Sequence, residues 1–249
     1  MELPTGNQLF IPREAYRYFP SGDTIYSGSE KNILRFIFYG VPFTNYEVSS
    51  LNQFKSLISS ISLPPFYTDQ ELIRILLSRK FDKKQSLQSL NNAIKWRELN
   101  LSNGYHSLYQ QSFHLLQSGS VYIQGIDHRY RPLIVLNLGK MDFKAHSVSE
   151  YSNLLCFTLE FAIKHLMIEG KIENWIVITD LGNCPLLKLP ISDLKKLIKT
   201  LQDNYRCRMI VNYVINAPSS ISFAWGMIKG VLDAQTACLL YTSPSPRDS

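Results

Sequence analysis

The sequence predicts an α/β fold, with a mixed and mainly parallel sheet and helices, preceded by a small all-α module. Residues 174–182 and 209–215 are strand-like, and the segment 190–205 between them carries its apolar residues on one helical face. Strand, helix and strand at this spacing form a βαβ unit, which favours parallel pairing and a right-handed crossover. Two further strand-like segments, 120–127 and 131–139, come before this unit and are separated by a polar turn.

Three capping pairs mark where helices begin, each with a short polar side chain three residues before a Glu or Gln. The pairs are Thr68 with Glu71, Asp82 with Gln85, and Ser147 with Glu150. The first two open the helices of the N-terminal module. The third opens a long helix that we expect to end near Gly170.

The chain divides into four parts by composition and periodicity. Residues 1–65 are a leader, rich in aromatic residues and serine, to which we assign no function; its segment "NILRFIFYGVPF" suits a strand or a short buried helix. Residues 66–116 are the helical module, and 117–237 are the α/β domain. Residues 238–249 end in "YTSPSPRDS", which resembles translated adapter sequence, so we expect a non-native tail and exclude it from the fold. We therefore expect an incomplete domain, in which the strand next to the missing one has unpaired N–H and C=O groups at an apolar edge.

Composition excludes several classes of protein. The 249 residues are 45% hydrophobic, enough for a sizeable core, and no apolar run approaches the ~18 residues of a membrane-spanning helix. The N-terminus carries no secretory signal, and the four cysteines form no C-x-x-C pair, which indicates reduced thiols in the cytoplasm. A net charge of +6 favours solubility or anionic membranes, and we expect no nucleic-acid partner.

Catalytic and metal-binding motifs are missing from the sequence. It contains no G-x-S-x-G, H-E-x-x-H, Walker or G-x-G-x-x-G motif, and its five histidines lack metal-ligand spacing. Asp180 ends a strand, where α/β enzymes often place an acid, but no partner group is evident. A turn role for Asp180 is favoured over catalysis. We predict no enzyme activity, no cofactor and no metal site.

Residues 211–236 begin as a strand, break at Asn216-Ala217-Pro218, and continue as a segment that is apolar around most of its circumference. A surface helix carries one apolar stripe and one polar face. The second part is therefore either buried on both sides or faces something apolar that is not protein. Its apolar residues are Ile221, Phe223, Ala224, Trp225, Met227, Ile228, Val231 and Leu232.

Five segments between about residue 66 and residue 237 resemble, in order, motifs of the CRAL-TRIO lipid-binding family. "LIRILLSRKFD" and "KWRELN" are similar to the Leu/Arg-rich helix and the Trp-Arg end of the family's N-terminal module. "GIDHRYRPLIVLNLGKMD" and "WIVITDLGN" resemble its strands, with Tyr130 in place of a usual glycine and Gly182 one residue early. "DNYRCRMIVNYVINAPSSISFAWGMIKGVLDAQT" is similar to the family's Tyr-Pro-Glu-Arg, Asn-Ala-Pro, aromatic helix and Leu-Asp-x-x-Thr.

The resemblance implies that the helix after Asn-Ala-Pro is a gate over a hydrophobic pocket. One side of 219–232 then packs on the sheet, and the other faces acyl chains or the bilayer. The gate and pocket residues are Ile221, Phe223, Trp225, Ile228, Val231 and Leu232. The function so implied is to bind one lipid, a phospholipid such as phosphatidylinositol, and to exchange it at membranes. We expect a cytoplasmic monomer that contacts membranes transiently.

The resemblance also implies two headgroup residues. Arg208 matches the arginine of the family's Tyr-Pro-Glu-Arg stretch, and Thr236 matches the threonine after the gate helix. Arginine binds phosphate through a two-pronged fork, and a hydroxyl adds a donor. Cys207 stands where the family has an acidic residue, and Leu239 where it has a lysine, so the phosphoinositide signature is incomplete. A purely structural role for Arg208 and for Thr236 stays open.

Two other functions stay open as well. Domains of this kind also serve as lipid-sensing regulatory or scaffold modules, which bind lipid without transferring it. A more remote alternative is an α/β hydrolase, against which the missing nucleophile elbow argues.

Overall fold

A computed structural model describes residues 11–27, 33–186, 189–217 and 239–242. The N-terminal part contains η1 (Arg13–Arg17), α1 (Gly22–Ile25), β1 (Tyr26–Ser27), β2 (Leu34–Arg35), α2 (Asn45–Leu57), α3 (Asp69–Ser78) and α4 (Lys83–Asn100). β3 (Ser102–Tyr105), α5 (His106–Ser112), η2 (Phe113–Ser118), β4 (Val121–Ile126), β5 (Pro132–Asn137) and η3 (Leu138–Lys140) follow. The remaining elements are α6 (Val148–His165), β6 (Trp175–Asp180), α7 (Ile191–Asn204), β7 (Met209–Ile215) and β8 (Leu240–Thr242).

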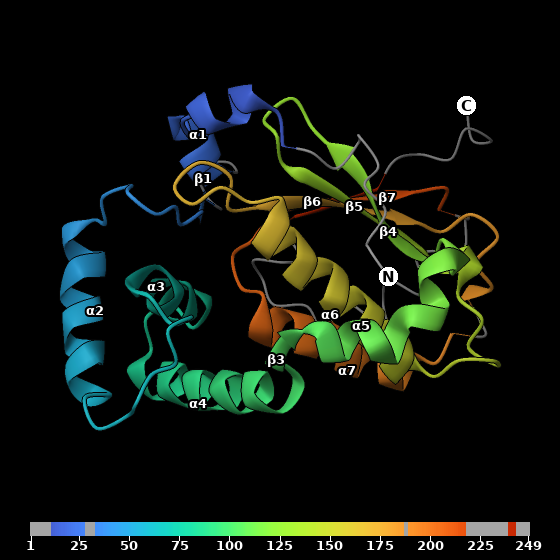
Figure 1. Ribbon diagram of the computed structural model, residues 1–249. Coiled ribbons are helices and arrows are strands. Elements are labelled where there is room, and N and C mark those ends of the chain that lie inside the picture. The colour runs from blue at the N-terminus through green and yellow to red at the C-terminus, as the bar shows by residue number, and fades with distance from the viewer. Residues whose placement is uncertain (1–10, 28–32, 187–188, 218–238, 243–249) are drawn as a thin grey trace.

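The main sheet has five strands in the order β4-β5-β6-β7-β8. β4 and β5 are antiparallel, and every other pair in the sheet is parallel. Helices α5, α6 and α7 lie on one side of this sheet, whereas α1 and β1 lie on the other (Figure 1). The predicted α/β class and the βαβ unit β6-α7-β7 are confirmed. No described helix combines the length and the apolar character needed to cross a membrane.

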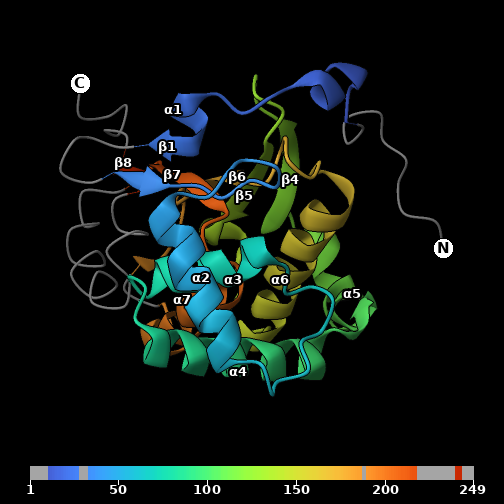
Figure 2. The ribbon, with the colours of Figure 1, turned by 90° about the vertical axis from the view of Figure 1, so that its left-hand side faces the viewer.

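The described part of the leader packs against the main sheet. In its aromatic segment Leu34–Arg35 form β2 and no described residue is helical, and Phe36, Ile37 and Phe38 are almost fully buried. Phe36 and Phe38 pack with Ile176 and Ile210 on the sheet face opposite α6. In Figure 2 this segment passes between the sheet and the helices of the N-terminal module. Both faces of the main sheet carry apolar side chains and must be buried. The leader's Phe36 and Phe38 cover part of the face opposite α6.

The helix starts agree with the capping pairs, with one exception. Asp82 accepts from the backbone N–H of Gln85 at 2.8 Å, and Ser147 with Glu150 forms a complete capping box. Thr68 is the N-cap of α3, but its side chain makes no capping bond, and the Glu71 carboxylate that would complete the box pairs with Arg208 instead. The long helix ends at His165, five residues before the expected Gly170, and a short turn with an Ile168–Ile172 bridge follows it.

The outer edge of β7 is paired, contrary to the expectation from the tail. Leu240–Thr242 form β8, which runs parallel to β7 with Asn212 opposite Leu240. The preceding Leu239 is buried, and its carbonyl accepts from the N–H of Asn212 at 2.8 Å. Residues that we had excluded from the fold therefore satisfy backbone groups that would otherwise lie unpaired.

Two left-handed residues stand where the resembled family uses glycine. Tyr130 has φ of 63° in the turn between β4 and β5, and Asn183 has φ of 58° after β6. Asparagine tolerates this conformation better than most residues, whereas tyrosine is strained in it. Asp127 stabilises the first turn, because its carboxylate accepts from the backbone N–H of Arg129 at 3.0 Å and of Arg131 at 2.8 Å.

Candidate functional site

An apolar cavity of about 320 Å³ lies between the sheet and helices α6 and α7. Its volume is roughly twice that of the ~150 Å³ cavity that admits benzene in an engineered protein. Most of the lining side chains are aliphatic. They are Ile134, Leu136, Leu138, Met141, Leu155, Leu159, Val177, Leu181, Leu186, Leu189, Leu194, Leu197, Ile198, Leu201, Met209, Val214, Leu239 and Leu240.

Strand alternation places one face of β6 on this cavity. Trp175, Val177 and Thr179 line it, whereas Ile176 points to the opposite face and packs with the leader's Phe36. α6 contributes Tyr151, Leu155 and Leu159, which are four residues apart and so share one helical face. α7 contributes its apolar face, which the sequence marks by periodicity. The periodicity of α7 predicted that this face packs against the sheet, but it did not indicate that a cavity lies between them.

One end of the cavity carries polar groups from the end of α7 and the residues after it. Arg206 and Gln202 both line the cavity there. Arg206 is 8% exposed, and its Nε and Nη2 make no hydrogen bond in the described part of the chain. Asp203 Oδ1 lies 3.6 Å from Nη2, beyond hydrogen-bond distance. Gln202 Nε2 is also buried without a partner among the described residues.

Burial holds the pKa of Arg206 below its usual value, because desolvation disfavours the charged form, and the neighbouring Arg79 acts in the same direction. An arginine stays protonated even after such a shift. Arg206 therefore carries a positive charge and has two donor groups that find no acceptor among the described residues. Unsatisfied buried donors are costly.

The structure places Arg208 in a different environment. Its Nη2 donates to Glu71 Oε1 at 2.6 Å and its Nη1 donates to the carbonyl of Glu173 at 3.2 Å. Arg74 joins the same cluster through Glu71 and through Glu173 Oε2, and its Nη2 also donates to the carbonyl of Ile37 at 2.7 Å. Two arginines and two glutamates thus neutralise one another where the leader, α3 and the sheet meet. The cluster borders a hollow of about 270 Å³, distinct from the apolar cavity.

Charge pairing outweighs burial at Glu71. Burial alone would raise the pKa of this carboxyl, but Arg74 and Arg208 hold it below its ordinary value. Burial lowers the pKa of Arg208 itself, and Arg74 adds to this shift. Glu71 and Arg208 are therefore both charged at neutral pH, and the guanidinium of Arg208 is already bound by protein groups.

The expected gate residues and Thr236 lie outside the described residues. The gate residues are Ile221, Phe223, Trp225, Ile228, Val231 and Leu232. Their roles remain predictions from the sequence.

Asp180 organises a turn at the carboxyl end of β6. Its Oδ1 accepts from the backbone N–H of Gly182 and from Asn216 Nδ2, both at 2.8 Å, and Asn137 lies within 3.4 Å of Oδ2. Gly139 approaches the same turn so closely that a Cβ on it would lie 2.0 Å from the carbonyl oxygen of Gly182. These contacts fit the turn role that the sequence favoured for Asp180.

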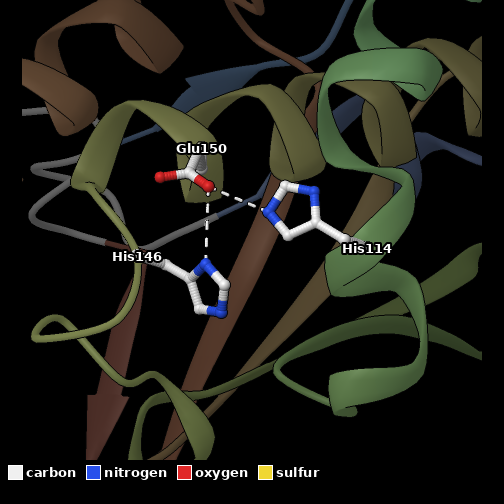
Figure 3. Close-up of side chains that lie close together, drawn as sticks. All are labelled: His114, His146 and Glu150. Carbon is white, nitrogen blue, oxygen red and sulfur yellow. Dashed lines mark hydrogen bonds and ion pairs between the residues drawn. The ribbon is translucent and has the colours of Figure 1, made fainter.

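Three side chains that could hold a cation meet away from the cavity. They are His114, His146 and Glu150, whose ligand atoms all lie within 4.8 Å of one another (Figure 3). The two histidines are far apart in the sequence, so their spacing gave no metal-binding pattern. Of the described thiols, Cys156 is buried, and burial raises its pKa to about 12, which makes it unreactive.

Comparisons with known proteins agree with the fold. The model of the CRAL/TRIO domain family matches residues 116–239. The phosphatidylinositol/phosphatidylcholine transfer protein SFH9 of Arabidopsis thaliana is 25% identical over 215 residues, which cover 78% of this chain and 37% of the relative. The Sec14 cytosolic factor of Schizosaccharomyces pombe is 28% identical over 184 residues, covering 68% and 64% respectively.

A solved structure shows the same fold. The crystal structure of Sfh5 has a TM-score of 0.63 and 16% sequence identity, with 81% of this chain and 82% of that chain covered. The chain spans little more than a third of the first curated relative that it matches. The matched domain, the relatives and the shared fold agree: residues 116–239 of this chain form a domain of the CRAL/TRIO family.

Proposed function

We propose that this chain binds one phospholipid in the apolar cavity and transfers it between membranes. The observation that carries the proposal is a cavity of about 320 Å³ with mostly aliphatic walls, lined also by the buried Arg206, whose Nε and Nη2 make no hydrogen bond among the described residues. A phospholipid has the complementary parts, acyl chains and a phosphate. Two of the relatives described above are named as a phosphatidylinositol/phosphatidylcholine transfer protein and a cytosolic factor, which supports transfer through the cytosol.

The acyl chains would provide most of the binding energy. Each methylene removed from water contributes roughly 0.8 kcal/mol, so a few methylenes on the aliphatic wall give substantial affinity. The wall formed by Leu155, Val177 and Leu197 offers no buried charge that the chains would have to desolvate. This part of the proposal concerns carriage and requires no catalytic group.

The phosphate would meet Arg206, assisted by Gln202. A guanidinium binds phosphate oxygens bidentately, and hydrogen bonds to charged groups are worth about 1.5–3 kcal/mol each. Arg208 was the sequence-based candidate for this role. Because Glu71 already holds Arg208, we propose Arg206 as the first phosphate donor, with Thr236 as a possible second one from the sequence alone.

Entry of the lipid would require the gate proposed at 219–232, with Trp225 facing acyl chains or the headgroup boundary. A charged residue there would have to enter an apolar environment. We expect Trp225→Asp to abolish loading from vesicles while the far-ultraviolet circular dichroism stays unchanged. A variant that fails to fold would show instead that Trp225 belongs to the core.

The test is transfer of fluorescent phosphatidylinositol or phosphatidylcholine from donor to acceptor vesicles by the full chain. Transfer that rises with protein concentration supports the proposal. Binding without transfer would favour a lipid sensor, and absence of both would overturn the proposal.

The variant Arg206→Leu tests the headgroup assignment. We expect phospholipid binding to fall by about tenfold or more, from the loss of one charge-assisted contact. Binding of diacylglycerol, which lacks the phosphate, should be unchanged. The exposed-site control Arg129→Leu, at the surface pair with Asp23, should affect neither lipid. Equal losses for both lipids with Arg206→Leu would contradict the phosphate role.

A further inference from the structure

Three segments bring a His-His-Glu cluster together at the start of α6. His114 comes from η2, His146 from the loop before α6, and Glu150 from the first turn of α6 (Figure 3). His114 Nε2 lies 2.9 Å from Glu150 Oε1, and His146 Nδ1 lies 3.4 Å from the same oxygen. We propose that these three side chains bind one divalent cation of the zinc class.

The ligand types suit zinc. Zinc sites use imidazole nitrogen and carboxylate oxygen at about 2.0–2.2 Å from the metal, in tetrahedral geometry. Neighbouring ligand atoms of such a tetrahedron are then roughly 3.3 Å apart. The two distances to Glu150 Oε1 lie on either side of this value, and all three ligand atoms are within 4.8 Å. Small side-chain rotations would therefore bring all three ligands to one ion.

The capping box orients the carboxylate for this role. Glu150 Oε2 accepts from both the backbone N–H and the hydroxyl of Ser147 at 2.8 Å, which leaves Oε1 directed at the two imidazoles. Such hydrogen bonds to a ligating carboxylate are the usual outer support of metal sites. His146 is further positioned by an edge contact with the ring of Tyr151.

The cluster retains access to solvent. The side chains of His114, His146 and Glu150 are 46%, 31% and 34% exposed. An ion can therefore reach the site, and a water molecule can complete the tetrahedron. A bound metal ion would link η2, and the loop that carries His146, to the N-terminus of α6. The next residue, Tyr151, lines the apolar cavity, so the metal would stiffen one of its walls. This inference does not depend on the proposed function.

The test is calorimetric titration of the metal-free full chain with zinc chloride. We expect one ion per chain and a rise in melting temperature on addition of zinc. His114→Ala and His146→Ala should each weaken binding by about tenfold or more, and should abolish the rise in melting temperature. The matched control is His128→Ala, which removes an exposed histidine from the turn between β4 and β5.

Cobalt distinguishes the cluster from the cysteines. Tetrahedral cobalt held by nitrogen and oxygen should give visible bands without the intense thiolate charge-transfer band of a cysteine site. Two results would overturn the inference: no saturable zinc binding by the full chain, or binding that survives unchanged in both His114→Ala and His146→Ala. A thiolate band would overturn it as well, because it would place the metal on cysteine.

Discussion

Arg208 donates to Glu71 Oε1 at 2.6 Å, and this buried ion pair joins the residue before β7 to the first turn of α3. The two residues are separated by 137 positions. Their contact fixes the N-terminal module against the sheet. Of the two roles that the sequence left open for Arg208, this contact favours the structural one.

Arg208→Ala should therefore destabilise the fold rather than remove a lipid contact. Removing one partner of a buried pair leaves an uncompensated charge and typically costs about 3–5 kcal/mol. Chemical denaturation should show a loss of this size, with charged and neutral lipids affected alike. Lys196→Ala, at the exposed pair with Asp193, should cost less than about 1 kcal/mol. If Arg208→Ala leaves stability unchanged and selectively weakens phosphatidylinositol binding, Arg208 contacts the lipid headgroup and the structural role is wrong.

Adjacent residues of β6 should respond oppositely to enlargement. Val177 faces the cavity, whereas Ile176 packs against the leader's Phe36 and Phe38. Val177→Phe should fold and lose lipid, because the ring occupies space that the ligand needs. Ile176→Phe should lose about 1–3 kcal/mol of stability through overpacking. Denaturation and lipid loading of both variants check this. The reverse pattern would mean that Ile176, and not Val177, faces the lipid-binding cavity.

Gly139→Ala should disrupt the turn beside Asp180. The new Cβ would lie 2.0 Å from the carbonyl oxygen of Gly182, so one of the two loops must move. We expect a loss of about 1–3 kcal/mol, measured by thermal unfolding. The control is Gly22→Ala in α1, where nothing lies within 4 Å of the new methyl group and stability should hold or rise. Equal stability of the two variants would show that the loops separate freely.

Acid should remove the contribution of the Glu150 carboxylate to the stability of the fold. Its pKa falls from an ordinary 4.5 to about 2, chiefly through the backbone and then the hydroxyl hydrogen bonds with Ser147. Because the folded-state pKa is depressed, the stabilisation is present above about pH 4.5 and is lost as the pH falls towards 2. The difference in melting temperature between the parent chain and Glu150→Gln should therefore shrink over this window. A difference independent of pH would contradict the assignment.

Local patterns in the sequence predicted the elements of the domain well. The apolar face of 191–204 and the strands on either side of it were visible as periodicities, because strand and helix repeat at different intervals. The Ser147–Glu150 box was visible because capping depends on residues three apart. The leader's aromatic run was ambiguous, since a short apolar run suits either a strand or a buried helix.

Contacts between distant residues were not predictable in this way. Glu71 was interpreted as half of a capping box, yet its carboxylate is bound by Arg74 and Arg208. Arg206 and Gln202 belong to no sequence motif. They stand out only in the structure, because both line the cavity and have buried donor atoms without a hydrogen-bond partner among the described residues. β8 was missed because its composition argued against any structure, whereas strand pairing depends mainly on backbone groups.

The most direct test of lipid carriage is mass spectrometry of the purified full chain under native conditions, followed by identification of the extracted lipid. The account predicts one phospholipid per folded chain, with much less bound to Val177→Phe and selective loss of phosphate-bearing lipids from Arg206→Leu. A folded chain that carries no lipid, and takes up none from vesicles of phosphatidylinositol and phosphatidylcholine, would contradict it.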